Sequence, residues 1–222
     1  MNSHNQSRSK FFKVISSGQS YLNLIYLMAA FPLGLFYFVF LVSGLSLGLS
    51  LAIIWIGIPI LLIVGIIWWL LAGFERSMAI YLLKEEVPAM ARPSQESTDL
   101  WARFKEYFAN PVTWKSLLFL FLKFPLGMAT FVILITLVSL TLAFLTMPFT
   151  YQFMDNFQVG LFITPDQSFW QIDSLTDALI AAAIGLMLWP VTLHITNGLA
   201  FVHAKFAKFM LGADSMNMLA SI

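Results

Sequence analysis

Four stretches of this 222-residue chain are long and apolar enough to cross a bilayer as helices, and they constrain its fold more than any other feature. A hydrocarbon core about 30 Å thick needs about 20 apolar residues in helical form. The stretches 22–42 and 49–74 hold no charged residue, 117–146 holds only Lys123, and 178–204 holds no Asp, Glu, Lys or Arg. The sequence therefore predicts an all-α, polytopic membrane protein with four transmembrane helices.

The four spans are expected to pair as two helical hairpins. The short segment 43–48, which contains two glycines, is predicted to join the first two spans as a tight link. A loop at about 147–173 is predicted to join the third and fourth. The expected organisation is an N-terminal tail (1–20), a first transmembrane hairpin (21–83), a linker with an interfacial helix (84–110), a second transmembrane hairpin (111–212) and a C-terminal tail (213–222).

The composition excludes most soluble functions. Only 10% of the residues are charged, against about 25% in an ordinary soluble domain. The chain has no cysteine, so disulfides, thiolate metal sites and cysteine nucleophiles are excluded. A net charge of +1 gives no reason to expect nucleic-acid binding. We find no nucleophile–base set, metal motif or phosphate loop, so the sequence predicts a non-catalytic protein without a cofactor or metal.

The basic residues indicate the orientation in the membrane. Lysine and arginine favour the cytoplasmic side of membrane proteins. The hairpin link and the 147–173 loop hold no basic residue. Lys123, about two turns inside the third span, is expected to snorkel back to the basic side. All 12 basic residues then share that side, so we expect a multi-pass protein of the cytoplasmic membrane with both termini cytoplasmic.

Cysteine labelling tests this orientation, because the chain has no native cysteine to interfere. We expect a membrane-impermeant thiol reagent, applied from outside, to label Gln167→Cys but none of Ser3→Cys, Ser94→Cys or Ser215→Cys. Outside labelling at any of these three positions would contradict the predicted topology.

Two segments beside the spans, 99–109 and 199–211, carry aromatic side chains on one face and charged side chains on the other. Helices of this kind lie in the headgroup plane of a bilayer. Their aromatic area exceeds what a simple anchor requires, so we expect a protein partner to dock there; anchoring alone is the alternative. The aromatic residues are Trp101, Phe104 and Phe108 in the first segment, and Phe206 and Phe209 in the second.

An internal repeat links the two hairpins. Phe31-Pro32-Leu33-Gly34 recurs 93 residues later as Phe124-Pro125-Leu126-Gly127, and ten of nineteen positions match between 31–49 and 124–142. Both copies start from the same side, so the repeats are parallel. A proline kinks a helix and a nearby glycine admits another backbone, so each motif is either a hinge or a packing kink. Pro59 and Pro190 are expected to add kinks to the other two spans.

Two polar groups near the spans are candidate sites. His194 and Asn197 are three residues apart on the fourth span and share a face. Ionisable groups inside a membrane are functional candidates, with a hydrogen-bonded packing role as the alternative. Glu75 and Arg76, at the end of the second span, form either a salt bridge or helix anchor, or a solvated interfacial pair.

Several segments together resemble a known sensor domain family. They are 26–40, 44–48, Ile56-Gly57-Ile58-Pro59-Ile60, Glu75-Arg76, and the entry to the third span at 110–115 and 123–127. This family is found at the N-terminus of many bacterial and archaeal histidine kinases, and the resemblance runs from about residue 21 to 212. It implies a four-helix membrane module that supplies input to a cytoplasmic transmitter. No phosphoacceptor or ATP-binding motif is present here, so kinase activity is not carried over.

The sequence therefore favours a non-catalytic membrane sensor or interaction module of the two-component type. It would pass a signal to, or assemble with, a separate kinase, regulator or membrane complex, and a homo-oligomer is a further option. The alternative is a small transporter or accessory subunit, which would need polar groups at the membrane midplane. A membrane enzyme would need a cluster of His, Asp or Glu at one interface, where only Glu75, His194 and His203 lie near that level.

Overall fold

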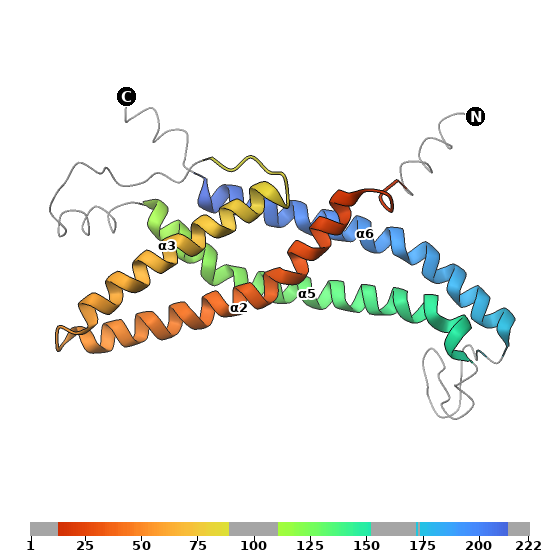
Figure 1. Ribbon diagram of the computed structural model, residues 1–222, viewed down its shortest axis with the longest axis horizontal. Coiled ribbons are helices and arrows are strands. Elements are labelled where there is room, and N and C mark those ends of the chain that lie inside the picture. The colour runs from red at the N-terminus through yellow and green to blue at the C-terminus, as the bar shows by residue number, and fades with distance from the viewer. Residues whose placement is uncertain (1–12, 89–110, 152–171, 173, 213–222) are drawn as a thin grey trace. The chain divides into compact units, whose positions relative to one another are not determined.

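The computed structural model describes residues 13–88, 111–151, 172 and 174–212. These residues form four helices and no strand (Figure 1). Each helix is long and apolar enough to cross a membrane. The predicted all-α class with four spans is confirmed. The helices are α2 (Gly18–Ala52), α3 (Gly57–Tyr81), α5 (Pro111–Thr150) and α6 (Leu175–Leu211).

Local sequence explains how α5 and α6 begin. Pro111 is the first residue of α5, a position where its missing N–H would have no helical acceptor. At the start of α6, the Asp177 backbone N–H donates to Ser174 Oγ at 3.2 Å, and that hydroxyl donates to the Asp177 carboxylate at 2.6 Å. The negative charge of Asp177 in the first turn also interacts favourably with the positive end of the helix dipole.

The turn between α2 and α3 lies at 53–56, so the predicted link at 43–48 is wrong. The helix continues through that glycine-containing segment. A Cβ on Gly44 would lie 2.7 Å from Val64 Cγ2 of α3, and Gly48 approaches α3 equally closely. These glycines therefore let the two helices of the hairpin pack closely rather than form a turn.

Pro59 lies in the first turn of α3, where proline is tolerated. The predicted kink at Pro59 inside the second span is therefore wrong. Pro32 and Pro190 do lie inside α2 and α6. Pro125 lies well inside the bounds of α5.

The described residues group into two compact units. The larger unit takes its residues from 21–131 and 197–222, and the smaller unit from 1–20 and 132–196. The larger unit therefore holds α3, nearly all of α2, the first part of α5 and the end of α6. The smaller unit holds the remainder of α5 and α6.

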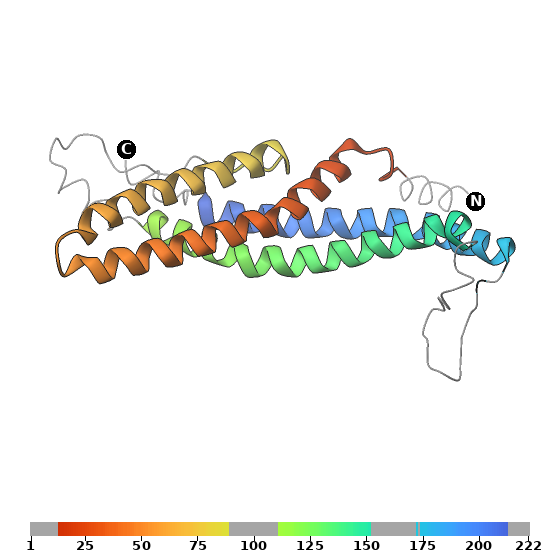
Figure 2. The same cartoon turned by 60° about the horizontal axis from the view of Figure 1, so that its bottom comes forward.

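The smaller unit is an antiparallel pair of helical segments (Figure 2). A buried hydrogen bond of 3.2 Å joins the Thr141 and Thr192 hydroxyls across the pair. A Cβ on Gly185 would lie 3.0 Å from the backbone nitrogen of Leu145, so the helices approach closely there. The buried apolar core consists of Phe144, Met147, Ile172, Ala178 and Ala181.

The core of the larger unit receives residues from all four helices and from the segment after α3. Small residues on α3 and α6 let these helices pack against their neighbours. The core consists of Tyr37, Leu41, Val64, Trp68, Ala72, Ala79, Val87, Phe119, Leu120, Ala207 and Leu211.

The segment 199–211 is not a separate interfacial helix, because α6 runs unbroken from Leu175 to Leu211. Ala200, Ala204 and Ala207 are buried along this part of α6. Their small side chains let the helix pack into the unit, which an interfacial helix does not do. The other predicted interfacial helix, 99–109, lies outside the described residues.

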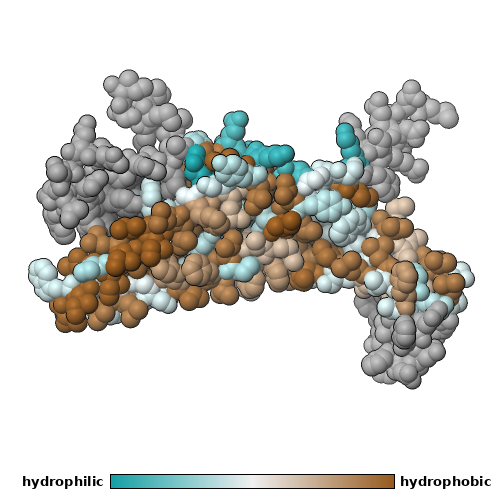
Figure 3. Space-filling model, viewed as in Figure 1, coloured by the Kyte–Doolittle hydropathy of each residue, from teal (hydrophilic) through white to brown (hydrophobic). Residues whose placement is uncertain are grey.

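The surface suits a lipid environment. Large apolar side chains such as Ile63, Leu70 and Leu186 are more than half exposed. In Figure 3 the visible face of the α2–α3 hairpin is largely hydrophobic, while hydrophilic residues gather where the segment after α3 lies by the end of α6. The chain is a multi-pass membrane protein.

Candidate functional site

Lys123 is buried in the larger unit, so the prediction that its side chain snorkels to the membrane surface is wrong. Its side chain is 1% exposed. The Nζ atom lies 2.8 Å from Glu75 Oε2 of α3 and donates to the Tyr26 hydroxyl of α2 at 2.6 Å. The Glu75 side chain is 0% exposed. A buried lysine remains charged only where a counter-charge compensates its lost hydration, and Glu75 supplies that charge.

Aromatic rings surround this ion pair. Lys123 Nζ lies 4.5 Å from the ring centroid of Tyr26 and 5.8 Å from that of Phe119, both within cation–π range. The His203 ring of α6 meets Tyr26 edge-on, with centroids 6.0 Å apart. All four helices thus contribute to one group, which we call the Lys123 cluster: Tyr26, Glu75, Phe119, Lys123 and His203.

Three buried polar atoms in and beside the Lys123 cluster have no hydrogen-bond partner among the described residues: Glu75 Oε1, Tyr37 OH and His203 Nε2. Tyr37 interacts electrostatically with Glu75 but makes no hydrogen bond of good geometry with it. An unsatisfied buried polar group costs about 1–3 kcal/mol. The Tyr37 hydroxyl and the Glu75 carboxylate are therefore close enough to influence each other, and each has an unused hydrogen-bonding atom.

The two Phe-Pro-Leu-Gly motifs contact each other where α2 and α5 cross. A Cβ on Gly34 would lie 2.8 Å from the carbonyl oxygen of Lys123, and one on Gly127 would lie 2.7 Å from that of Ala30. Residues 30 and 123 are 93 positions apart, as are 34 and 127. The crossing is therefore reciprocal, as in a two-fold interface.

The phenylalanines at the crossing follow the same reciprocity. Phe31 stacks on Phe131 and Phe38 stacks on Phe124, each with ring centroids 5.0 Å apart. Phe31 and Phe124 also stack on each other at 6.3 Å. Both glycines and all four rings are thus used in packing the crossing tightly, and the hinge hypothesis stays a prediction.

Two further hydrogen bonds join the first helix of each hairpin to the second helix of the other. The Trp68 indole of α3 donates to Ser116 Oγ of α5 at 2.9 Å. Asn23 of α2 donates to Asn197 Oδ1 of α6, also at 2.9 Å. Ser116 and Asn23 are again 93 positions apart. The hairpins of the larger unit are therefore interlocked by polar as well as apolar contacts.

The structure places the predicted polar residues in different surroundings. Arg76 does not pair with Glu75; its guanidinium donates to the carbonyls of Val87 and Pro88, each at 2.8 Å. Asn197 accepts its bond from Asn23, whereas the His194 side chain is exposed on α6.

Sequence reasoning missed the Lys123–Glu75 pair, although a signal was present. Lys123 is the only charged residue in its span, and Glu75 follows directly on an uncharged one. Two lone opposite charges in apolar helices are expected to find each other, because each is costly alone.

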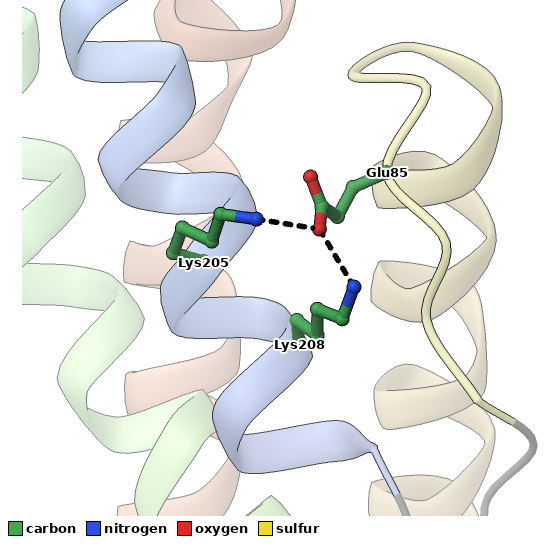
Figure 4. Close-up of polar contacts among 3 residues, drawn as sticks. All are labelled: Glu85, Lys205 and Lys208. Carbon is green, nitrogen blue, oxygen red and sulfur yellow. Dashed lines mark hydrogen bonds and ion pairs between the residues drawn. The ribbon is translucent and has the colours of Figure 1, made fainter.

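A second polar group lies at the ends of α3 and α6. Glu85 Oε1 accepts hydrogen bonds from Lys205 Nζ and Lys208 Nζ, each at 3.0 Å (Figure 4). These bonds hold the pKa of the Glu85 carboxyl below its ordinary value. The carboxylate is therefore ionised at neutral pH, and on acidification the contacts persist until the pH falls below the ordinary range of a glutamate.

The aromatic residues predicted for docking differ in exposure. Phe206 stacks on Phe119 with centroids 5.3 Å apart, whereas Phe209 is 69% exposed. Trp101, Phe104 and Phe108 lie outside the described residues. Among the described residues, no group of three His, Asp or Glu could hold a metal ion.

Comparison with known proteins gave one family. The sequence model of a family described as "Putative sensor" matches residues 26–211. The matched range includes the α2–α5 crossing and the whole Lys123 cluster. Comparison with curated proteins found no match, and neither did comparison with solved structures.

Proposed function

The chain belongs to this sensor family, and from that premise we propose that it is a non-catalytic membrane module that passes a signal to, or assembles with, a separate protein partner. The partner would be a kinase, a regulator or a membrane complex on the cytoplasmic side, where we place both termini. The observation that carries the proposal is the Lys123 cluster, in which all four helices meet at one buried ion pair.

The Lys123 cluster supports a relay, by which we mean that a displacement of one helix is passed on to the others, and the reason is mechanical. Lys123 and Glu75 cancel in charge and lie sealed within the unit, so they hold helices together rather than attract a charged ligand. A displacement of any one helix must move the pair or break it, and packed interiors switch between discrete arrangements rather than deform smoothly. The unpartnered polar atoms in and beside the pair would supply hydrogen-bonding groups to such a second arrangement.

The continuity of α6 supplies a path from the cluster to the proposed docking surface. His203 lies in the cluster, and Phe209 lies less than two turns further along the same unbroken helix. Phe209 is well exposed, so a partner can reach it. Phe206 is partly buried against Phe119, so its part in docking is smaller than its sequence pattern predicted.

Site-specific photocrosslinking tests the proposal. A photoreactive residue at position 209 is expected to crosslink one defined protein in cells, and Phe209→Glu is expected to abolish copurification of that protein. Position 149 is the matched control, because Phe149 is 78% exposed near the end of α5 that we place on the outside. Phe149→Glu is expected to leave copurification unchanged.

The outcome separates a docking surface from an anchor. If position 209 captures only lipid while the variants still insert, then the end of α6 is an anchor and the proposed partner surface is wrong. If Phe149→Glu abolishes copurification as strongly as Phe209→Glu, then the loss of copurification reflects misfolding, and the proposed partner surface is again wrong.

A further inference from the structure

An open cavity of about 640 Å³ lies between the segment after α3 and the end of α6. Four of its seven lining residues are charged, although apolar atoms make up most of its exposed wall. It is lined by Ile80, Lys84, Glu85, Glu86, Val87, Pro88 and Lys208. Lys205 reaches the same place, because its ammonium shares Glu85 Oε1 with Lys208 (Figure 4).

The cavity carries an excess of positive charge. The single carboxylate of Glu85 cancels only one of the two charges of Lys205 and Lys208, and both ammonium groups point to the same oxygen atom. The other two charged residues of the lining, Lys84 and Glu86, cancel each other. Each ammonium has three N–H donors, so most of them remain available. The lysine side chains are 50% and 42% exposed, so a ligand can reach them from outside.

The wall formed by residues 84–88 is held in place before any ligand binds. Arg76 bonds to two of its carbonyls, and the Glu85 N–H donates to the Ala79 carbonyl at 3.3 Å. Val87 is buried in the core of the unit. Lys84 is held at a backbone φ of 54°, which a non-glycine residue adopts only under local constraint. A preformed wall lowers the entropic cost of binding.

We propose that this cavity binds the anionic phosphate group of a phosphate ester. Lys205 and Lys208 would donate hydrogen bonds to the phosphate, which would displace the Glu85 carboxylate from them. A phosphate presents several acceptor oxygens to two ammonium groups, whereas Glu85 presents only one oxygen to both. The proposal does not depend on a protein partner and goes beyond the relay function.

The surroundings favour a phospholipid headgroup as the source of the phosphate. Tyr81 at the end of α3 and Phe209 near the end of α6 are 78% and 69% exposed. Exposed aromatic residues at helix ends lie at the headgroup level of a bilayer. A soluble phosphate ester offers the same chemistry, so the experiment includes both sources.

Displacing Glu85 has a structural consequence. Glu85 connects the end of α6 to the segment that follows α3, across more than 100 residues of sequence. A bound phosphate would keep the lysines paired and release this connection. The segment itself would stay bonded to Arg76 and to the Ala79 carbonyl, so the ligand would release α6 from it without dismantling the wall.

The test measures binding to the purified full-length protein in neutral detergent. One arm titrates short-chain phosphatidylglycerol, with short-chain phosphatidylcholine as the zwitterionic control, and the other arm titrates glycerol phosphate. The variants are Glu85→Gln and the double variant Lys205→Gln/Lys208→Gln. Lys13→Gln is the matched control, since it removes one exposed lysine from the same predicted side of the membrane.

We expect the double variant to weaken binding of the phosphate ester at least about tenfold, since each lysine near a membrane surface contributes about 1 kcal/mol. Glu85→Gln is expected to tighten binding about threefold or more, an effect that partial unfolding cannot produce. Lys13→Gln is expected to change affinity less than about twofold.

The arm that shows this pattern identifies the source, and binding in the phosphatidylglycerol arm alone means a lipid headgroup. The proposal is overturned if neither phosphate ester binds, if the double variant binds as tightly as the wild type, or if Glu85→Gln weakens binding.

Discussion

Replacing Lys123 with methionine is expected to lower the free energy of unfolding by about 3–5 kcal/mol, the usual effect of breaking a buried ion pair. Methionine matches the apolar stem of lysine, so little cavity is left. The loss comes from Glu75, whose carboxylate is 0% exposed and would remain buried without its 2.8 Å partner. The Tyr26 hydroxyl would lose its bond from Lys123 as well.

Removing both charges should restore most of this stability. In the double variant Lys123→Met/Glu75→Leu no uncompensated charge remains, and apolar replacements of buried pairs are often neutral or stabilising. Unfolding in detergent, followed by tryptophan fluorescence, measures Lys123→Met, Glu75→Leu and the double variant. The difference between the loss in the double variant and the sum of the losses in the two single variants gives the coupling between the two residues.

Lys205→Met is the matched control for the same substitution at the surface. The Lys205 side chain is 50% exposed and its ammonium pairs with Glu85, so we expect a loss of no more than about 1 kcal/mol. If Lys123→Met is as mild as Lys205→Met, the buried pair does not hold the unit together, and the relay proposed from it loses its basis. If the double variant is as unstable as Lys123→Met, the loss arises from packing rather than from charge.

Gly34→Ala and Gly127→Ala are each expected to lower the free energy of unfolding by about 1–3 kcal/mol, as overpacking does in a close-packed interior. The added Cβ would lie 2.8 Å and 2.7 Å from backbone carbonyl oxygens of Lys123 and Ala30. A backbone cannot turn aside as a flexible side chain can, so the α2–α5 crossing must open. Because the contacts are reciprocal, the two losses should be similar.

Gly65→Ala provides the control for the crossing, because a Cβ on Gly65 would meet nothing within 4 Å. Alanine is a better helix former than glycine by about 0.5–1 kcal/mol, so this variant should be unchanged or slightly more stable. The same unfolding measurement applies. Losses at Gly34 and Gly127 no larger than at Gly65, or very different from each other, would contradict a tight reciprocal crossing.

Hydropathy along the chain was enough to predict the class of the protein, for a physical reason. A bilayer offers no hydrogen bonds to the backbone, so an uncharged stretch of about 20 apolar residues must satisfy its own backbone as a helix. That rule is local and needs no knowledge of neighbours. The four spans could therefore be predicted from hydropathy alone, and Pro111 marked the start of α5 from its own chemistry.

The roles of individual residues inside that framework depend on which helices pack together, and the sequence does not reveal this. Gly44 could have been a turn residue, but it faces Val64 of the neighbouring helix. The amphipathic pattern of 199–211 is the same whether one face meets lipid headgroups or the Phe119 side of a helix bundle.

Lys123 shows the limit most clearly. A lone lysine about two turns inside a predicted span is expected to reach water unless a carboxylate lies within a few ångströms, and the carboxylate that Lys123 meets is 48 residues away in the chain. Hydropathy is a property of a segment, whereas burial of a charge depends on which other segment faces it. Folding brought Glu75 to Lys123, and that contact turned a predicted surface lysine into the centre of the unit.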